Sequence, residues 1–317
     1  MKTIIKYRLP RVAVVMFTLL LLSCMKEDMS DCLEEIRVYF TYSTQSINPA
    51  DVDQMHLYVF NSDGYFVGEY RDDNITNFNA DYYMNVSDLL PGSYRFIAWG
   101  GKDESFYSTA PTSFVAGETT FDEALLMLKH PGNIVSTPPH HLFHSSLPAT
   151  VVTTEKLLIF YMPLVQISNT INISTVGLPA DANSYSFNIT DINCLYNFDG
   201  SFANHNHEAI TYTAACLKDN AHQLHSTLNV LRLSADRRTP QLQIYNKTAG
   251  TVLYPVGSQS GDLIDLILKA YPQNNFETTH TYDIVLTFSG DGSTGFDVNI
   301  SINGWQVKED GGELVDN

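Results

Sequence analysis

Apolar and polar residues alternate along most of this chain in short runs. Residues 36–42, 55–60 and 94–99 show this period of two, which directs successive side chains to opposite faces of a β-strand. Turn-forming Gly, Pro, Asn and Asp residues separate the runs, as in the Asn-Ser-Asp-Gly sequence at residues 61–64. Many short strands joined by such turns predict antiparallel β-sandwiches. Further strands are expected at residues 65–70, 83–86, 156–160, 164–173, 185–190, 227–233, 242–245, 282–288 and 296–302.

Two segments depart from simple alternation. Residues 164–173 keep the period of two except near Asn169, where we expect a bulge. Residues 263–270 instead repeat their apolar positions at helical spacing, with Asp262 placed to cap the start and Pro272 to end the segment. We therefore expect one short helix in an all-β chain, and no parallel sheet, because βαβ alternation is missing.

A loop-like segment at residues 130–154 divides the chain. It is rich in Pro and His and has little periodicity. The chain from residue 24 onward has 294 residues, which exceeds the roughly 100–150 residues of a typical domain. We expect two sandwich domains, at residues 35–150 and 151–317, with the helix in the second.

The first 24 residues have the organisation of an export signal. Four basic residues precede an apolar core at residues 12–22, which is shorter than the roughly 20 residues needed to span a bilayer. The segment ends in Leu-Leu-Ser-Cys, which resembles a bacterial lipobox, so cleavage would leave Cys24 as a diacylated N-terminus. An ordinary signal with a chance cysteine is the alternative. We expect residues 1–23 to be a lipoprotein signal peptide and residues 24–34 to be an acidic tether.

The charge balance excludes several partners. Without the signal, the chain would carry 14 basic and 35 acidic residues, a net charge of −21. Nucleic-acid binding needs a basic face, which this composition does not favour. Adhesion to anionic lipid by charge is disfavoured as well, so membrane attachment should depend on the acyl chains alone.

Cysteines, histidines and acidic residues give no convincing catalytic or metal-binding pattern. If the exported chain forms a disulfide, the pair expected is Cys194–Cys216, 22 residues apart in one predicted domain. The other interpretation is that Cys32, Cys194 and Cys216 are three buried thiols. Histidines cluster at residues 140–144, 205–207 and 222–225, but these segments are predicted loops, and surface histidines are the better interpretation. Oxygen-bearing residues at 191–199 are only faintly like a calcium loop and predict a hairpin turn. We expect no metal, cofactor, small-molecule substrate or enzymatic activity.

Aromatic residues in the first strands allow two interpretations. They could form a carbohydrate-binding face, or they could pack in the core, which is the commoner reason for such residues. The residues concerned are Tyr39, Phe40, Tyr42, Tyr58 and Phe60.

Several motifs occur together in the order seen in one family. The most specific are residues 91–101, Pro-Gly-Ser-Tyr-Arg-Phe-Ile-Ala-Trp-Gly-Gly, and the Asn-Gly-Trp at residues 303–305. They accompany the lipobox with Ser-Asp-Cys at 30–32, the strand at 55–60 before Asp63-Gly64, and the segment from 189 to 200. The chain thus resembles the Bacteroidetes fimbrial anchor-subunit lipoproteins of the FimB/Mfa type over nearly its whole mature length.

The resemblance implies a fold and a role. The fold would be two tandem transthyretin-like antiparallel β-sandwiches. The role would be to attach a fimbrium to the outer membrane and limit its length, with fimbrial stalk subunits as partners. Lys26, Glu27 and Asp28 look like the signal that sends such lipoproteins to the outer face, and a solvated tether is the alternative. The competing function is a surface-exposed glycan-binding lipoprotein.

The resemblance also suggests what the first strand does. Polymerising relatives lose an N-terminal strand by proteolysis and accept a neighbour's strand in its place. An anchor would lose its lipid in the same step, and this chain has no Arg between Cys24 and Ile36 for an arginine-specific protease. We expect residues 36–42 to stay in their own sheet, so that the fimbrium contacts another edge or the C-terminal segment.

Overall fold

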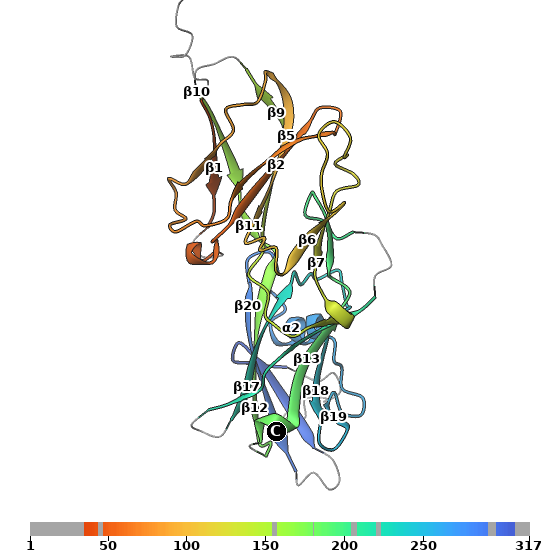
Figure 1. Cartoon of the computed structure of the whole chain (residues 1–317). Coiled ribbons are helices and arrows are strands. Elements are labelled where there is room, and N and C mark those ends of the chain that lie inside the picture. The colour runs from red at the N-terminus through yellow and green to blue at the C-terminus, as the bar shows by residue number, and fades with distance from the viewer. Residues whose placement is uncertain are drawn as a thin grey trace, which may run out of the picture.

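The structure is a computed structural model, and it describes residues 35–43, 47–153, 157–179, 181–203, 208–219, 223–290 and 296–307. These residues form β-strands almost throughout, with a single α-helix among them. Figure 1 shows two β-sandwiches arranged end to end, with the first strands at one end and the last strands at the other. The predicted all-β class, with two sandwiches and one short helix in the second, is confirmed. Among the described residues there is no helix with the length and apolar character needed to cross a membrane.

The first sandwich packs a three-stranded sheet against a five-stranded sheet. Their strand orders are β10-β1-β4 and β11-β9-β5-β2-β3. The strands are β1 (Glu35–Thr41), β2 (Met55–Asn61), β3 (Phe66–Asp72), β4 (Tyr83–Asn85), β5 (Gly92–Gly100), β9 (Phe143–Val152), β10 (Leu157–Pro163) and β11 (Val165–Gln166), and a short 3-10 helix, η2, covers Pro49–Asp51.

Strands β2 and β5 are buried on both faces. In β2, Leu57 and Val59 face the core of the first sandwich, while Tyr58 and Phe60 belong to the core that continues into the second. In β5, Trp99 also faces the second core. The two sandwiches therefore share an apolar junction, which explains why six successive residues of β2 are buried.

The second sandwich contains the remaining sheets and the helix. Its large sheets have the orders β16-β17-β12-β20-β21-β22 and β19-β18-β13-β15-β8. The elements are η3 (Pro131–Asn133), β8 (Ile134–Val135), β12 (Ser168–Val176), η4 (Ala182–Ser184), β13 (Tyr185–Asp191), β15 (Ile210–Ala214), β16 (Leu217–Lys218), β17 (Leu224–Leu231), β18 (Gln241–Asn246), β19 (Thr251–Tyr254), α2 (Leu263–Ala270), β20 (Thr281–Ser289), β21 (Asp297–Ile302) and β22 (Trp305–Gln306).

Helix α2 matches the prediction in its bounds and its cap. The side chain of Asp262 accepts a hydrogen bond from the backbone N–H of Asp265 at 3.0 Å, which satisfies one of the free donors of the first turn. The five apolar residues of the predicted stripe are all buried. The prediction of a wholly antiparallel topology is wrong for three strand pairs, because β1 with β10, β12 with β20 and β15 with β8 are parallel.

The passage between sandwiches lies later than predicted. A boundary at residue 150 would divide β9, which pairs with β5 as far as Val152. Strand β10 then pairs with β1, and β11 with β9, so the first sandwich continues to Gln166. Strand β12 of the second sandwich begins at Ser168. The break in alternation near Asn169 is this passage and not a bulge.

A fifth, small sheet joins strands from both halves of the chain. It has the order β14-β7-β6. Strands β6 (Tyr107–Ala110) and β7 (Leu125–Leu128) precede β9 in the chain, whereas β14 (Leu195–Asn197) follows β13. Residues from the first half of the chain thus complete the second half, which a single boundary does not describe.

Candidate functional site

Strand β1 is the central strand of its sheet. It runs parallel to β10, with Glu35 opposite Leu157 and Thr41 opposite Pro163, and antiparallel to β4. Its inward side chains, Ile36, Val38 and Phe40, are fully buried in the first core. In the uncleaved chain the first strand therefore lies within its own sheet. Removing it would take away a row of core side chains and the main-chain partners of two strands.

The outward face of this sheet carries a row of three tyrosine rings. The ring centroid of Tyr39 lies 5.2 Å from that of Tyr83 on β4 and 5.6 Å from that of Tyr161 on β10. Arg37 covers the ring of Tyr83 at 4.8 Å and pairs with Glu35 at 2.7 Å. Through its hydrogen bond, Arg37 lowers the pKa of Glu35. We call Tyr39, Tyr83 and Tyr161 the tyrosine row.

The tyrosine row is poorly suited to stacking on a sugar ring. Tyr39 lies between the two other rings, and Arg37 covers Tyr83, so most ring faces already have a neighbour. Three of the other aromatic residues proposed for a carbohydrate face, Phe40, Tyr58 and Phe60, are buried in the cores. Core packing, the commoner explanation, is the one the structure supports for these three.

Strand β10 forms one end of this sheet, beside β1. Its seven residues are Leu-Leu-Ile-Phe-Tyr-Met-Pro, without a charge. Leu157, Ile159 and Tyr161 point outward and are 45%, 42% and 60% exposed. On its other side, no strand among the described residues pairs with β10. We call this unpaired side the β10 edge.

The residues predicted for lipid attachment and export lie outside the described residues. They are Cys24, Lys26, Glu27 and Asp28. They precede Glu35, the first residue of β1, in the chain. A lipid on Cys24 would therefore be joined covalently to the central strand of the first sheet.

A cluster at the junction of the sandwiches includes a buried histidine. His144 lies with its ring centroid 4.7 Å from that of Trp99, and its Nε2 donates to the carbonyl of Phe198 at 3.0 Å. Burial lowers the pKa of His144 to about 4. Gly200 lies against this ring with a φ of +81°, where a Cβ would come within 2.6 Å of the histidine Nδ1. We call Trp99, His144, Phe198 and Gly200 the junction cluster.

The surface position predicted for the histidines is confirmed for His140 and wrong for His144. His144 is buried in β9, whereas His140 is exposed and pairs with Asp53 at 3.4 Å. His205, His207 and His222 lie outside the described residues. Within the part of the chain that the structure describes, no three histidine, cysteine or acidic side chains gather as metal ligands would.

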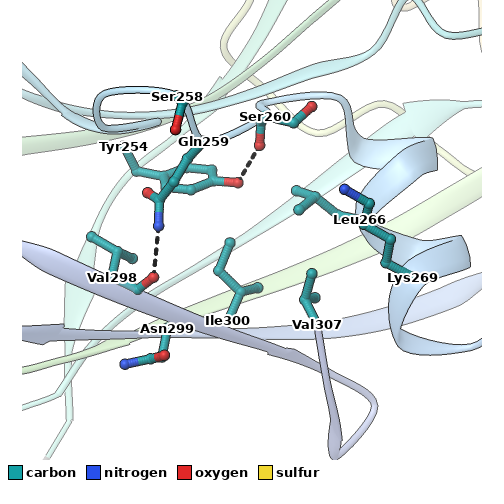
Figure 2. Close-up of a pocket in the computed structure, with 10 residues that line it drawn as sticks. All are labelled: Tyr254, Ser258, Gln259, Ser260, Leu266, Lys269, Val298, Asn299, Ile300 and Val307. Atoms are coloured by element: carbon teal, nitrogen blue, oxygen red, sulfur yellow. Dashed lines mark hydrogen bonds between the residues drawn. The ribbon is translucent and has the colours of Figure 1, made fainter. Parts of the chain in front are cut away.

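A cavity of about 180 Å³ lies between α2 and β21 (Figure 2). Its wall includes the Gly-Ser-Gln-Ser-Gly segment at 257–261. The Nε2 of Gln259 donates to the carbonyl of Val298 at 2.8 Å, so this side chain holds the loop on β21. The rest of the wall shown in Figure 2 consists of Tyr254, Leu266, Lys269, Val298, Asn299, Ile300 and Val307. The described lining residues include no histidine or carboxylate to activate either serine, so the segment is a structural loop.

With this geometry established, the chain can be compared with known proteins. A family model for the fimbrillin-A associated anchor proteins Mfa1 and Mfa2 matches residues 29–311. The chain belongs to this family. Among curated protein sequences no match was found. The family is one of fimbrial anchor proteins, so fimbrial subunits are the partners of the family and the cell-surface fimbrium is its place of action.

Solved structures share the fold of this anchor-family chain. The fimbrial anchor protein Mfa2 from Porphyromonas gingivalis has a TM-score of 0.71 and 21% identity, over 86% of this chain and 98% of that one. A polysaccharide-binding candidate from Bacteroides thetaiotaomicron has a TM-score of 0.71 and 22% identity, over 86% and 96%. An adhesin candidate from the same organism has a TM-score of 0.68 and 20% identity, over 86% and 97%. At these identities the likeness concerns the fold alone.

The disulfide expected in this anchor-family chain is not formed. Cys194 and Cys216 are free thiols, and burial raises the pKa of both. Strands β13 and β15 are antiparallel, with Asp191 opposite Ile210 and Phe187 opposite Ala214. Cys194 follows the end of β13 and Cys216 follows the end of β15, so they lie at opposite ends of the pair. A disulfide needs Cα atoms within about 7 Å, which this arrangement prevents.

The oxygen-bearing segment after β13 folds as a turn, as predicted. Asn197 N–H donates to the carbonyl of Ser201, and Gly200 N–H donates to the carbonyl of Asn197, both at 2.9 Å. Asn193 is buried instead, accepting from Tyr212 and donating to the carbonyl of Leu231. Backbone hydrogen bonds thus close the turn, and the Asn193 side chain is bonded to protein groups in the core.

The β10 edge is the surface that sequence reasoning missed. A strand was predicted at 156–160, but in the second domain and without an edge position. The signal in the sequence was the uninterrupted apolar run that ends at Pro163. This run does not distinguish a central strand from an edge strand, because both can have that composition.

Proposed function

We propose that this chain is the lipid-anchored base of a fimbrium, held in the outer membrane through Cys24. The membership in the anchor family and the lipobox motif support this assignment. The observation that carries it is the position of β1 between β10 and β4, which joins the lipidated end of the chain to the core of the first sandwich. A pull on the fimbrium would be resisted by that core.

The same strand accounts for a limit on length. A polymerising subunit must open its first sheet to accept a neighbour's strand, whereas this chain keeps that position filled by β1. Its first sheet cannot continue the polymer in the same way. A chain incorporated at the base would therefore end growth there.

Deletion and complementation test this function. We expect cells without the gene to shed fimbriae or to carry overlong ones, and the natural gene to restore attachment and length. A Cys24→Ala gene should fail to restore attachment, because the lipid has no site. Cys216→Ala is the matched control, since it removes a half-buried thiol in the second sandwich, and it should restore attachment. Unchanged attachment and length in the deletion strain would contradict the proposal.

A further inference from the structure

The β10 edge has features that isolated sheet edges avoid. An edge strand presents unpaired N–H and C=O groups, and soluble proteins protect such edges with charges, proline, bulges or very short strands. Strand β3, at the other side of the first sandwich, also has seven residues but includes Glu69, Arg71 and Asp72. Strand β10 has seven residues without a charge, and its single proline, Pro163, comes at the end.

The other sheet ends in the structure are protected by being short. Those in the second sandwich and in the small sheet consist of two to four residues, namely β16, β22, β19, β8, β14 and β6. Among the strands that stand at the end of a sheet in the described residues, β10 therefore combines length, apolar side chains and absence of charge. Such an edge is expected to be covered in the working protein.

We propose that the β10 edge binds an extended segment of the adjoining fimbrial subunit, which adds to the sheet as a fourth strand beside β10. The proposal rests on the proposed function and names the surface through which the base grips the fimbrium. Strand β1 stays in place, so the new strand extends the sheet and does not replace a member of it.

The chemistry of the edge identifies the kind of segment that fits. A strand supplies a row of main-chain donors and acceptors for the unpaired groups of β10, which lipid tails cannot do. Leu157, Ile159 and Tyr161 would contact alternate side chains of the added strand. Because Arg37 is already paired with Glu35, the outward face of the sheet favours uncharged, apolar partners there. The added strand would also continue the tyrosine row beyond Tyr161, which stands at its open end.

A second copy of this chain is a less suitable occupant. Without the signal, two copies would bring together two chains of formal net charge −21 each. Such chains repel one another unless close contacts offset the charge. We therefore assign the edge to a different fimbrial subunit, and self-pairing becomes an outcome that the experiment detects.

Photo-crosslinking on intact cells tests the contact directly. A benzophenone amino acid replaces Tyr161 at the β10 edge in the full-length chain, and Trp305 in the second sandwich serves as the control. Both are aromatic, and they are 60% and 61% exposed, so solvent access is matched. We expect an adduct containing the major fimbrial subunit from position 161 and none from position 305. An adduct of two copies of this chain, or no adduct on cells whose fimbriae stay attached, would overturn the proposal.

A charge placed on the edge gives a second, functional test. Ile159→Glu puts a carboxylate on an outward position that is 42% exposed to solvent, so the fold should persist. We expect a fall of about tenfold or more in attached fimbriae, because a charge would be buried against an apolar strand. Val252→Glu, on the exposed edge strand β19, is the control and should leave attachment unchanged.

The outcomes separate this inference from the proposed function. If gene deletion sheds fimbriae while Ile159→Glu retains them, the chain is the base but grips the fimbrium elsewhere. If deletion has no effect, the proposed function itself fails. The attachment test requires that both glutamate variants have the surface amount and the melting temperature of the natural chain. If only Ile159→Glu has a lowered melting temperature, the crosslink from position 161 decides between the outcomes.

Discussion

The first sandwich carries two aromatic groups that meet opposite surroundings. The junction cluster, with Trp99 and His144, is sealed between the sandwiches. The tyrosine row, with Tyr39 and Tyr161, lies on the outside of the first sheet and ends at an unpaired strand. Both groups come from alternating strands of similar composition, so aromatic content alone does not distinguish a core from a docking surface. The neighbouring elements distinguish them. Strand β14 and the turn after it cover the junction cluster, whereas no described element covers the tyrosine row.

The difference predicts that the two groups affect different properties. Loss of a junction side chain should lower the free energy of unfolding, since a cavity would open between the sandwiches. Loss of a side chain on the tyrosine row should leave stability nearly unchanged and affect attachment.

The largest expected effect is that of Trp99→Ala. Trp99 is fully buried, so the substitution should cost about 3–5 kcal/mol of unfolding free energy. Tyr161→Ala, at a side chain that is 60% exposed, should cost less than about 1 kcal/mol. Urea unfolding of the two variants measures both values. Equal losses would show that the tyrosine row is part of the core and would remove the contrast.

The pH dependence of stability comes next. The pKa of His144 is about 4 in the folded chain, below its ordinary value of 6.5. As the pH falls below 6.5 the unfolded chain binds this proton first, so stability is lost between pH 6.5 and pH 4. The loss amounts to about 3 kcal/mol.

His144→Gln isolates that contribution, because both chains keep the same carboxylates. The unfolding free energy of the natural chain should fall relative to that of the variant as the pH is lowered from 7 to 4. Parallel pH curves for the two chains would mean that His144 is not buried in its neutral form.

Gly200→Ala tests the close contact within the junction cluster. The new Cβ would lie 2.6 Å from the Nδ1 of His144 at a φ of +81°, so we expect a loss of about 2 kcal/mol or more. Gly250→Ala is the matched control, since its φ is +71° but its Cβ would meet only the Tyr245 hydroxyl at 3.8 Å. Gly250→Ala should lower the unfolding free energy by about 1 kcal/mol, which is the cost of placing a side chain at a positive φ. Equal losses in thermal unfolding would argue against the contact.

The smallest effect on stability is expected beside the tyrosine row. Arg37→Ala removes the cation over Tyr83 and the exposed ion pair with Glu35, and should leave the unfolding free energy nearly unchanged. Chemical denaturation in low and high salt checks this expectation. A loss above about 2 kcal/mol would show that the outward face is a structural layer in its own right.

Local signals predicted the local structure well. The helix was predictable because its cap, its apolar stripe and its terminating proline lie within a dozen residues. The strands at 36–42, 55–60 and 94–99 followed from alternation in the same way. Sheet membership was not predictable, because which strands pair depends on contacts between distant segments. Thus β10 was assigned to the second domain although it pairs with β1, and the direction of β13 against β15 separated two cysteines that sequence spacing had brought together.

The functional site was predictable only in part. The lipobox predicts Cys24 as the lipid site, and this stays a prediction. The resemblance identified the family, which the family model confirms. The β10 edge was not predictable, since its importance depends on the lack of a described neighbour on one side of a strand.

The proposed anchoring requires that the lipid and β1 remain in one polypeptide. The mass of the intact protein extracted from the cell surface tests it most directly. We predict a mature chain that begins at diacylated Cys24 and retains β1. A mature chain that begins beyond Tyr42 would contradict the account, because the strand that ties the lipid to the first core would have been removed.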